Sequence, residues 1–150
     1  MTKTIGDNFV AQLHREHLKP VGFKKNRHTF VRSHDGYAEH YQIQGSAWND
    51  PSTAWSCYLN CGISFDGLPA RSPDKDFPRT HGWMRSGVFV KNARPQYDVT
   101  VANSAVMAKE IAEVISRCSD YFQRRHAFLL KSYQDGSYER GFLADPQRGR

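Results

Sequence analysis

Residues 55–65, WSCYLNCGISF, alternate between apolar and polar side chains over their whole length. The odd-numbered positions are all apolar, whereas the even-numbered positions are Ser, Tyr, Asn or Gly. Because successive side chains leave a β-strand on opposite faces, this period predicts a strand with one face in the core and one polar face. A chain of 150 residues is the size of one domain, so we predict a single domain over residues 1–150.

Two further strands are predicted upstream of this one. Residues 23–33 contain strand-forming side chains, and the Asp-Gly pair that follows favours a tight turn into a second strand over about residues 37–48. Turn-forming residues at 49–52 then lead into residues 55–65. Strands joined by such short connections favour an antiparallel meander.

The N-terminal segment is predicted to be a short helix. Asp7 or Asn8 can cap it, an apolar stripe follows, and Pro20 and Gly22 end it. Since isolated helices of this length are marginal in water, we expect packing against the rest of the chain to hold it.

A longer helix is predicted near the C-terminus. Asn103 or Ser104 can cap it, and apolar residues at i, i+3 and i+4 spacing over 107–122 make a broad face that we expect to lie on the apolar side of the sheet. A further helical turn or two is expected through residue 133. Residues 137–150 have the composition of a frayed tail.

Residues 66–86 interrupt the pattern with several Pro and Gly residues and mixed charges. They predict a long loop, and loops of this length are often functional or mobile. Two short strands at about 87–91 and 97–101 are predicted to form a second hairpin. The chain as a whole therefore predicts an α+β fold: an antiparallel sheet of about five strands with an N-terminal helix and a long C-terminal helix packed on one face.

The composition indicates a soluble protein of the reducing cytoplasm. The formal net charge of +6 favours acidic partners, but the basic residues are spread along the chain as on an ordinary solvated surface. The three cysteines are an odd number in apolar registers, and the N-terminus lacks the apolar core of a secretory signal. No stretch approaches the ~18 apolar residues that a membrane span needs, so we predict no membrane partner.

Four short stretches share a pattern of Gly, aromatic and Gln residues: 18–25 (LKPVGFKK), 30–32 (FVR), 42–46 (QIQGS) and 58–63 (YLNCGI). In these residues the chain resembles the bacterial proteins grouped as domain of unknown function 4304, most clearly over about residues 9–65. The resemblance implies an order of strands followed by a terminal helix. It implies no activity.

The residues typical of catalytic or metal sites do not form a recognisable motif. His14 and His17 lack the i, i+4 spacing of the zinc-protease helix. Cys57 and Cys61 are about 13 Å apart on an extended strand, too far for a disulfide or a shared metal, and Cys118 is predicted to be a small core residue. Neither a G-x-S-x-G elbow nor a phosphate-binding Gly-rich loop occurs. We predict no catalytic residue, no metal site and no cofactor.

The polar face of the meander is the best candidate for a binding site. It combines amides, an imidazole, a phenol and a guanidinium on rigid strands: Arg32, His40, Gln42, Gln44, Tyr58 and Asn60. The register of Arg32 is open, because Phe23 and Phe30 have opposite parity and burying both requires a bulge. The alternative is that this face is simply exposed to water, since antiparallel sheets commonly leave one polar face to solvent.

The favoured function is a non-enzymatic binding or interaction module that uses the polar face and the loop at 66–86, with a protein as a possible partner of unknown identity. The first alternative is a nucleic-acid-binding protein, because the aromatic residues Phe23 and Phe30 lie near basic ones in a chain with a net charge of +6.

The second alternative is a small hydrolase or metal-dependent enzyme. It would rely on His40, on Tyr58, or on Asp74 and Asp76 as paired carboxylates that bind a cation or transfer protons. Solvated loop charge is the simpler interpretation of these two carboxylates, because Lys75 lies between them. We therefore favour a function other than catalysis.

Overall fold

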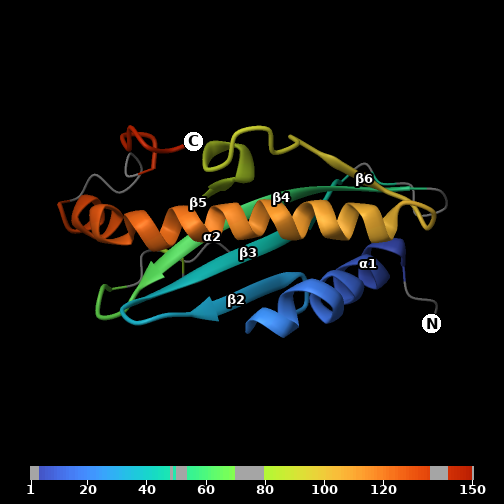
Figure 1. Cartoon of the computed structure of the whole chain (residues 1–150), viewed down its shortest axis with the longest axis horizontal. Helices are drawn as coiled ribbons and strands as arrows, with labels where there is room; N and C mark the ends of the chain where they lie inside the picture. Colours follow the sequence, from blue (N-terminus) through green and yellow to red (C-terminus); the bar gives the residue numbers. More distant parts are fainter. Residues whose placement is uncertain (1–3, 48, 50–53, 70–79, 136–141, 150) are drawn as a thin grey trace.

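The computed structural model describes residues 4–47, 49, 54–69, 80–135 and 142–149. It contains a six-stranded antiparallel sheet that the long helix α2 crosses on one face, with the N-terminal helix α1 beside α2 (Figure 1). The predicted α+β fold is confirmed. The described helices and strands are α1 (Ile5–Leu13), β1 (Lys24–Asn26), β2 (Thr29–Ser33), β3 (Tyr37–Gly45), β4 (Trp55–Phe65), β5 (Gly82–Arg85), β6 (Tyr97–Val99) and α2 (Ser104–Gln134).

Strand β4 is the centre of the sheet and pairs with three other strands. β3 lies along one side of β4 and pairs with residues 57–65. β5 and β6 share the opposite side, β5 beside residues 60–63 and β6 beside residues 55–57. β1 and β2 extend the sheet beyond β3, and β6 is the strand predicted at 97–101. The alternation over 55–65 thus identified the strand around which the sheet is built.

The strand predicted at residues 87–91 is wrong, because a 3-10 turn begins just before this segment. The strand lies instead at Gly82–Arg85, inside the predicted loop 66–86. Gly82 suggested a loop, but here the strand passes so close to its neighbours that a Cβ at this position would approach Phe142 Cε2 to 2.9 Å. The predicted second hairpin does not form, since β5 and β6 each pair with β4.

Helix α1 begins earlier than predicted. Thr4, rather than Asp7 or Asn8, is its N-cap, because Thr4 Oγ1 accepts a hydrogen bond of 3.1 Å from the Asp7 backbone N–H. The helix continues into a π-helical turn at His14–Leu18 and a 3-10 turn. It stops at Gly22, whose φ of 96° is left-handed, so the predicted end is confirmed.

The segment predicted as one strand over residues 23–33 is two strands. A two-residue turn joins β1 to β2, and Arg27 in this turn has a positive φ of 55°. Phe23 and Phe30 are both buried. The turn, rather than a bulge, reconciles their opposite parity because it reverses the chain between them. The even-numbered side chains of β2 face α2, because Phe30 lies opposite the buried Tyr41 of β3.

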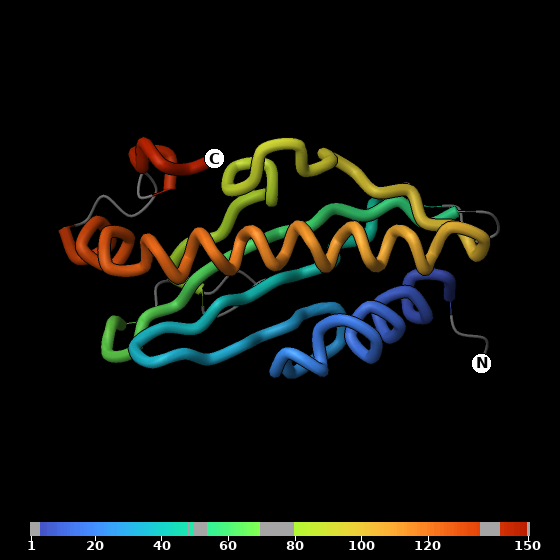
Figure 2. Tube along the Cα trace, viewed as in Figure 1, coloured from blue at the N-terminus to red at the C-terminus, as the bar shows by residue number. Residues whose placement is uncertain are grey.

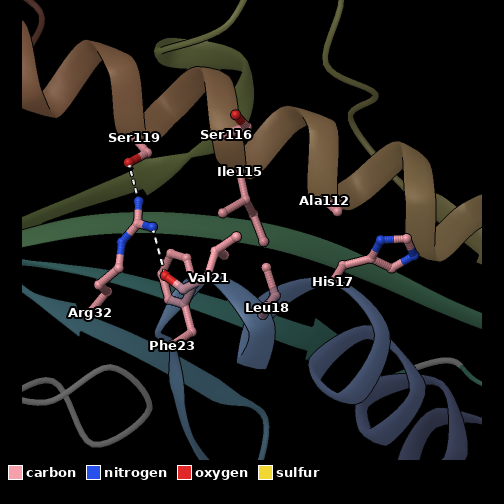
Figure 3. A pocket seen from close by; sticks show the side chains of 9 residues that line it. All are labelled: His17, Leu18, Val21, Phe23, Arg32, Ala112, Ile115, Ser116 and Ser119. Carbon is pink, nitrogen blue, oxygen red and sulfur yellow. Dashed lines mark hydrogen bonds between the residues drawn. The ribbon is translucent and has the colours of Figure 1, made fainter.

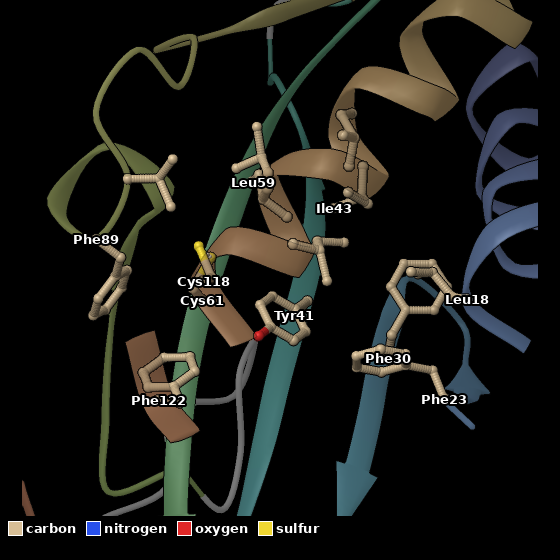
Figure 4. Close-up of a cluster of buried hydrophobic side chains, with 14 of the residues drawn as sticks. Leu18, Phe23, Phe30, Tyr41, Ile43, Leu59, Cys61, Phe89, Cys118 and Phe122 are labelled. Carbon is tan, nitrogen blue, oxygen red and sulfur yellow. Dashed lines mark hydrogen bonds between the residues drawn. The ribbon is translucent and has the colours of Figure 1, made fainter. Parts of the chain in front are cut away.

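Helix α2 is a single helix of 31 residues that begins after Asn103, as predicted. Its buried face packs on the apolar side of β3 and β4. Figure 4 shows Cys118 and Phe122 of α2 beside Tyr41 of β3 and Cys61 of β4. The Cys118 and Cys61 sulfur atoms are 3.5 Å apart, and the Tyr41 and Phe122 ring centroids are 6.4 Å apart. The predicted packing of the apolar face against the sheet is confirmed.

The described C-terminal residues 142–149 fold back beside α2 (Figure 2). Phe142 is buried. The Asp145 carboxylate accepts hydrogen bonds of 2.8 and 2.9 Å from the Arg125 guanidinium. The prediction of a frayed tail is therefore wrong for these residues, because a side chain from α2 anchors them.

Candidate functional site

Strands β3, β4 and β5 place polar side chains across the sheet on the face opposite α2. Gln42 lies opposite Asn60, which in turn lies opposite Arg85. The adjacent row pairs Gln44 with Tyr58. Directly opposed residues of antiparallel strands share a face, so these five side chains are neighbours. The structure thus brings four predicted candidates together and adds Arg85. We call Gln42, Gln44, Tyr58, Asn60 and Arg85 the Arg85 cluster.

Hydrogen bonds connect the amides of this cluster in a chain. Asn60 Nδ2 donates to Gln42 Oε1 at 2.8 Å and to Gln44 Oε1 at 2.9 Å. Arg85 Nη1 donates to Asn60 Oδ1 and, at 2.9 Å, to Gln44 Oε1. Because a guanidinium only donates, the amide atoms that face Arg85 must be oxygens, which sets the orientation of both amides. Asn60 is completely buried with its amide fully paired, so the network is rigid.

Arg85 is held on one side and open on the other. Its Cζ lies 4.3 Å from the centroid of the Tyr58 ring, a cation–π arrangement. Nη1 contacts the two amide oxygens, whereas Nε and Nη2 have no hydrogen-bond partner among the residues that the structure describes. Within the same residues, no carboxylate forms an ion pair with Arg85. The guanidinium is oriented, but its charge is not compensated by this part of the chain.

Sequence reasoning missed Arg85 because it falls in the predicted loop 66–86. Trp83 leaves the sheet on the same face, opposite Gly62. The signal for a strand was that Met84, which packs against the core, lies between Trp83 and Arg85, which face the other side. It spans a strand of only 4 residues, which is too short to outweigh the Pro and Gly residues upstream.

His40, another predicted candidate, lies one row further along the same face, opposite Gly62. Its Nε2 is 2.8 Å from Ser64 Oγ. Burial, and next the charge of nearby His81, lowers the pKa of His40 to about 4. This imidazole is therefore neutral at neutral pH and is a weak base.

The polar face is much less exposed than a water-facing surface. Asn60, His40 and Gln42 keep only 0, 8 and 9% of their surface exposed. The interpretation of the face as simply solvated is therefore wrong for these three residues. Exposure increases toward the other members of the Arg85 cluster, and Arg85 itself is exposed.

Arg32 does not belong to this face, and its predicted inclusion is wrong. It lies opposite Glu39 in the sheet and points toward α2, where its Nη2 donates to Ser119 Oγ at 2.7 Å. Arg32 Nε and Nη2 also donate to Glu39 Oε2 at 3.3 and 3.2 Å. The physical reason is the register of β2 with β3, which places Arg32 opposite the buried Glu39 and therefore on the helix side.

Glu39 is a completely buried carboxylate in a register that predicted apolar residues. Besides Arg32, it contacts His34 Nε2 and accepts hydrogen bonds of 2.7 Å from the Tyr41 hydroxyl and 3.1 Å from the Ser119 hydroxyl. A buried charge persists only when it is paired in this way. We call Arg32, His34, Glu39, Tyr41 and Ser119 the Glu39 cluster.

A cavity of about 170 Å³ lies between the π-helical turn and α2 (Figure 3). Arg32 forms part of its wall, bonded to Ser119 and, at 2.9 Å, to the Val21 carbonyl. The remaining lining residues are His17, Leu18, Phe23, Ala112, Ile115 and Ser116. Because Glu39 compensates the charge of Arg32, this cavity offers a ligand little net charge.

Two observations bear on the alternative functions. Phe23 and Phe30 are 4% and 0% exposed, so their rings are not available to stack on bases. Burial, and next the charge of Asp98, raises the pKa of Cys57 to about 12, which makes its thiol a poor nucleophile. Asp74 and Asp76 lie outside the described residues.

Two kinds of feature are absent from the described residues. Over 4–47, 49, 54–69, 80–135 and 142–149, no three His, Cys, Asp or Glu side chains are grouped so that they could hold a metal ion. In the same ranges, no helix has both the length and the apolar character needed to cross a membrane.

Comparisons with curated proteins and with solved structures found no match. A family model described as Domain of unknown function (DUF4304) matches residues 14–124. The matched span begins in the π-helical turn and ends within α2, so it contains the whole sheet and both the Arg85 and Glu39 clusters. The chain therefore belongs to the DUF4304 family.

Proposed function

We propose that this protein is a non-enzymatic binding module and that the face of the sheet opposite α2 is its recognition surface. The Arg85 cluster is the centre of this surface. The observation that carries the proposal is the guanidinium of Arg85, which is fixed by Gln44, Asn60 and Tyr58 while Nε and Nη2 have no partner among the described residues. A side chain that is oriented but not saturated is typical of a binding site.

The chemistry of the surface favours recognition over catalysis. The amides of Gln42, Gln44 and Asn60 already bond to one another or to Arg85, and amides do not transfer protons at neutral pH. His40, with a pKa of about 4, is a weak base. The free and buried thiols of Cys57, Cys61 and Cys118 support the prediction of a reducing, cytoplasmic location.

Affinity capture from cell extract tests the proposal. The wild type, a double variant Gln44→Ala/Tyr58→Ala and a control variant Lys109→Ala on the exposed side of α2 are immobilised at equal density. We expect at least one protein to be enriched on the wild type and on the control, and to be lost from the double variant. Equal recovery on all three surfaces, or no enrichment on any, would contradict the proposal. Circular dichroism of the double variant verifies that it is folded.

A further inference from the structure

We infer that Arg85 is a receptor for a carboxylate and that the partner of this surface presents an acidic side chain to it. The inference rests on the proposed function and specifies its chemistry. It depends on three properties of Arg85: the donors that remain open, the rigidity of the guanidinium and the absence of a compensating charge among the described residues.

The open donors have the geometry of a carboxylate. Nη1 is occupied by the oxygens of Asn60 and Gln44, which leaves the Nε–H and the two Nη2–H groups of Arg85 without partners in the described part of the chain. Nε–H and one Nη2–H point in parallel from the same edge of the guanidinium. This edge donates two hydrogen bonds to the two oxygens of one carboxylate.

The guanidinium is oriented before any ligand arrives. Two amide oxygens hold Nη1, and the Tyr58 ring supports the plane of the group at 4.3 Å from Cζ. Asn60 is completely buried and bonded to Gln42 behind it, so the support is itself fixed. A side chain that is already ordered loses less conformational entropy on binding.

The charge of Arg85 is available to a ligand. Its partners Gln44, Asn60 and Tyr58 are neutral groups, which orient a cation without neutralising it. Arg32 shows the opposite case, because the carboxylate of Glu39 occupies its Nε and Nη2. An external carboxylate on Arg85 would take the position that Glu39 takes on Arg32.

A carboxylate matches this site better than a phosphate monoester does. One guanidinium balances the single charge of a carboxylate, whereas a phosphate monoester carries about −1.5 to −2 at neutral pH and presents three acceptor oxygens. The Arg85 cluster contains no second cation, because its other members are Gln42, Gln44, Tyr58 and Asn60.

Titration of the ¹⁵N-labelled protein with N-acetylglutamate methylamide tests the inference, with the Nε–H resonance of Arg85 as the readout. N-acetylglutamine methylamide is the neutral control ligand of the same shape. We expect a saturable shift with the glutamate probe and none with the glutamine probe. Equal shifts with both probes, or no shift with either, would reject the inference.

Variants and inorganic phosphate complete the test. In the variants, where the Nε–H of Arg85 is lost, the backbone amides of Tyr58 and Asn60 report binding. Arg85→Lys is expected to weaken binding by ~10-fold, because an ammonium lacks the two-donor edge, and Arg85→Gln is expected to abolish it. Arg117→Gln, an exposed position on α2 with the same change in net charge, is the matched control and should bind as the wild type does. Binding that Arg117→Gln weakens as much as Arg85→Gln does would show a general charge effect.

If inorganic phosphate binds more tightly than the glutamate probe, the ligand of Arg85 is a phosphate and the carboxylate assignment is wrong. If Arg85→Gln loses the captured partner in extract but the glutamate probe does not bind the wild type, the proposed function stands and the carboxylate assignment fails. If the glutamate probe binds but no partner is captured, the carboxylate assignment stands and the proposed function fails.

Discussion

Each face of the sheet holds an arginine stacked on an aromatic ring, but among the residues that the structure describes only one of the two meets a carboxylate. Arg32 lies 4.5 Å from the centroid of Phe23 and bonds to the buried Glu39. Arg85 Cζ lies 4.3 Å from the centroid of the Tyr58 ring, and within the described ranges Arg85 bonds to amide oxygens alone. The same side chain is thus a structural element on the helix side and an open donor on the other side.

The difference follows from what surrounds each arginine. The Glu39 cluster lies under α2, where a charge without a partner would be costly, so every charge there is compensated. The Arg85 cluster lies near the sheet edge, where side chains are more exposed. The amides beside Arg85 do not neutralise its charge, but water can solvate it. Compensation of the charge therefore separates the arginine that stabilises the fold from the arginine that is available to a ligand.

The largest expected effect is on the helix side. Glu39→Ala leaves Arg32, Ser119 and the Tyr41 hydroxyl without their shared acceptor, and we expect the free energy of unfolding to fall by about 3–5 kcal/mol. Urea denaturation measures this loss. Glu113→Ala removes an exposed carboxylate from α2 and should change the same quantity by less than about 0.5 kcal/mol. Equal losses in both variants would show that the buried cluster is not the stabilising feature we infer.

On the polar face, the buried neutral imidazole of His40 predicts a loss of stability in acid. The pKa of His40 is about 4 in the folded protein, against an ordinary value of 6.5, so below pH 6.5 the unfolded chain binds the proton more readily. The contribution is fully present above about pH 6.5, is lost as the pH falls toward about 4, and changes no further below that.

A variant isolates this contribution from that of the other titrating groups. With about 1.4 kcal/mol for each pKa unit between 6.5 and about 4, the whole contribution is about 3–4 kcal/mol, and most of it is lost between pH 7 and pH 4.5. His40→Gln should remove that part of the pH dependence, as measured by urea denaturation at pH 7 and pH 4.5. A curve that stays parallel to that of the wild type would exclude His40 as the origin.

A smaller effect is expected within the amide network. Asn60→Ala removes the donor to Gln42 and Gln44 and the acceptor for Arg85, and we expect the free energy of unfolding to fall by about 1–3 kcal/mol. Arg85 also loses its fixed orientation, so binding of the glutamate probe should weaken together with stability. Gln123→Ala, an exposed amide on α2, is the control and should change neither. If stability falls but probe binding does not change, the amide network is not needed to orient Arg85 for binding.

The sequence predicted those parts of the fold in which the hydrophobic pattern extends over many residues, so that single residues that break the pattern do not hide it. The alternation over 55–65 and the helical period of α2 extend over many residues, so the sheet centre and the helix across it were correctly predicted. β5 has only 4 residues and was taken for a loop. That residues 1–150 form one domain stays a prediction.

The candidate site was predictable only where side-chain register followed from a continuous strand. Gln42 and Gln44 on β3 and Asn60 on β4 lie on the predicted face because no turn interrupts either strand. Arg32 was assigned to the wrong face because its register depends on the pairing of β2 with β3, where it lies opposite Glu39. Glu39 was overlooked because it is a charged residue at a position where the period predicts apolar side chains. Pairing of charges across a hairpin has no signal in the local period of a sequence.

The smallest expected effect is the most direct test of the contrast between the two arginines. Arg85→Lys keeps a cationic donor that can reach the amide oxygens of Gln44 and Asn60, and an exposed position tolerates such a change, so the free energy of unfolding should shift by less than about 0.5 kcal/mol. The same substitution at Arg32 removes a guanidinium that uses Nε, Nη1 and Nη2 for three different partners, Glu39, Val21 and Ser119, and should cost about 1–3 kcal/mol. Urea denaturation of both variants under one set of conditions gives the difference directly. Equal losses in the free energy of unfolding at the two positions would mean that Arg85 stabilises the fold as much as Arg32 does. The open donors of Arg85 would then not support a binding role.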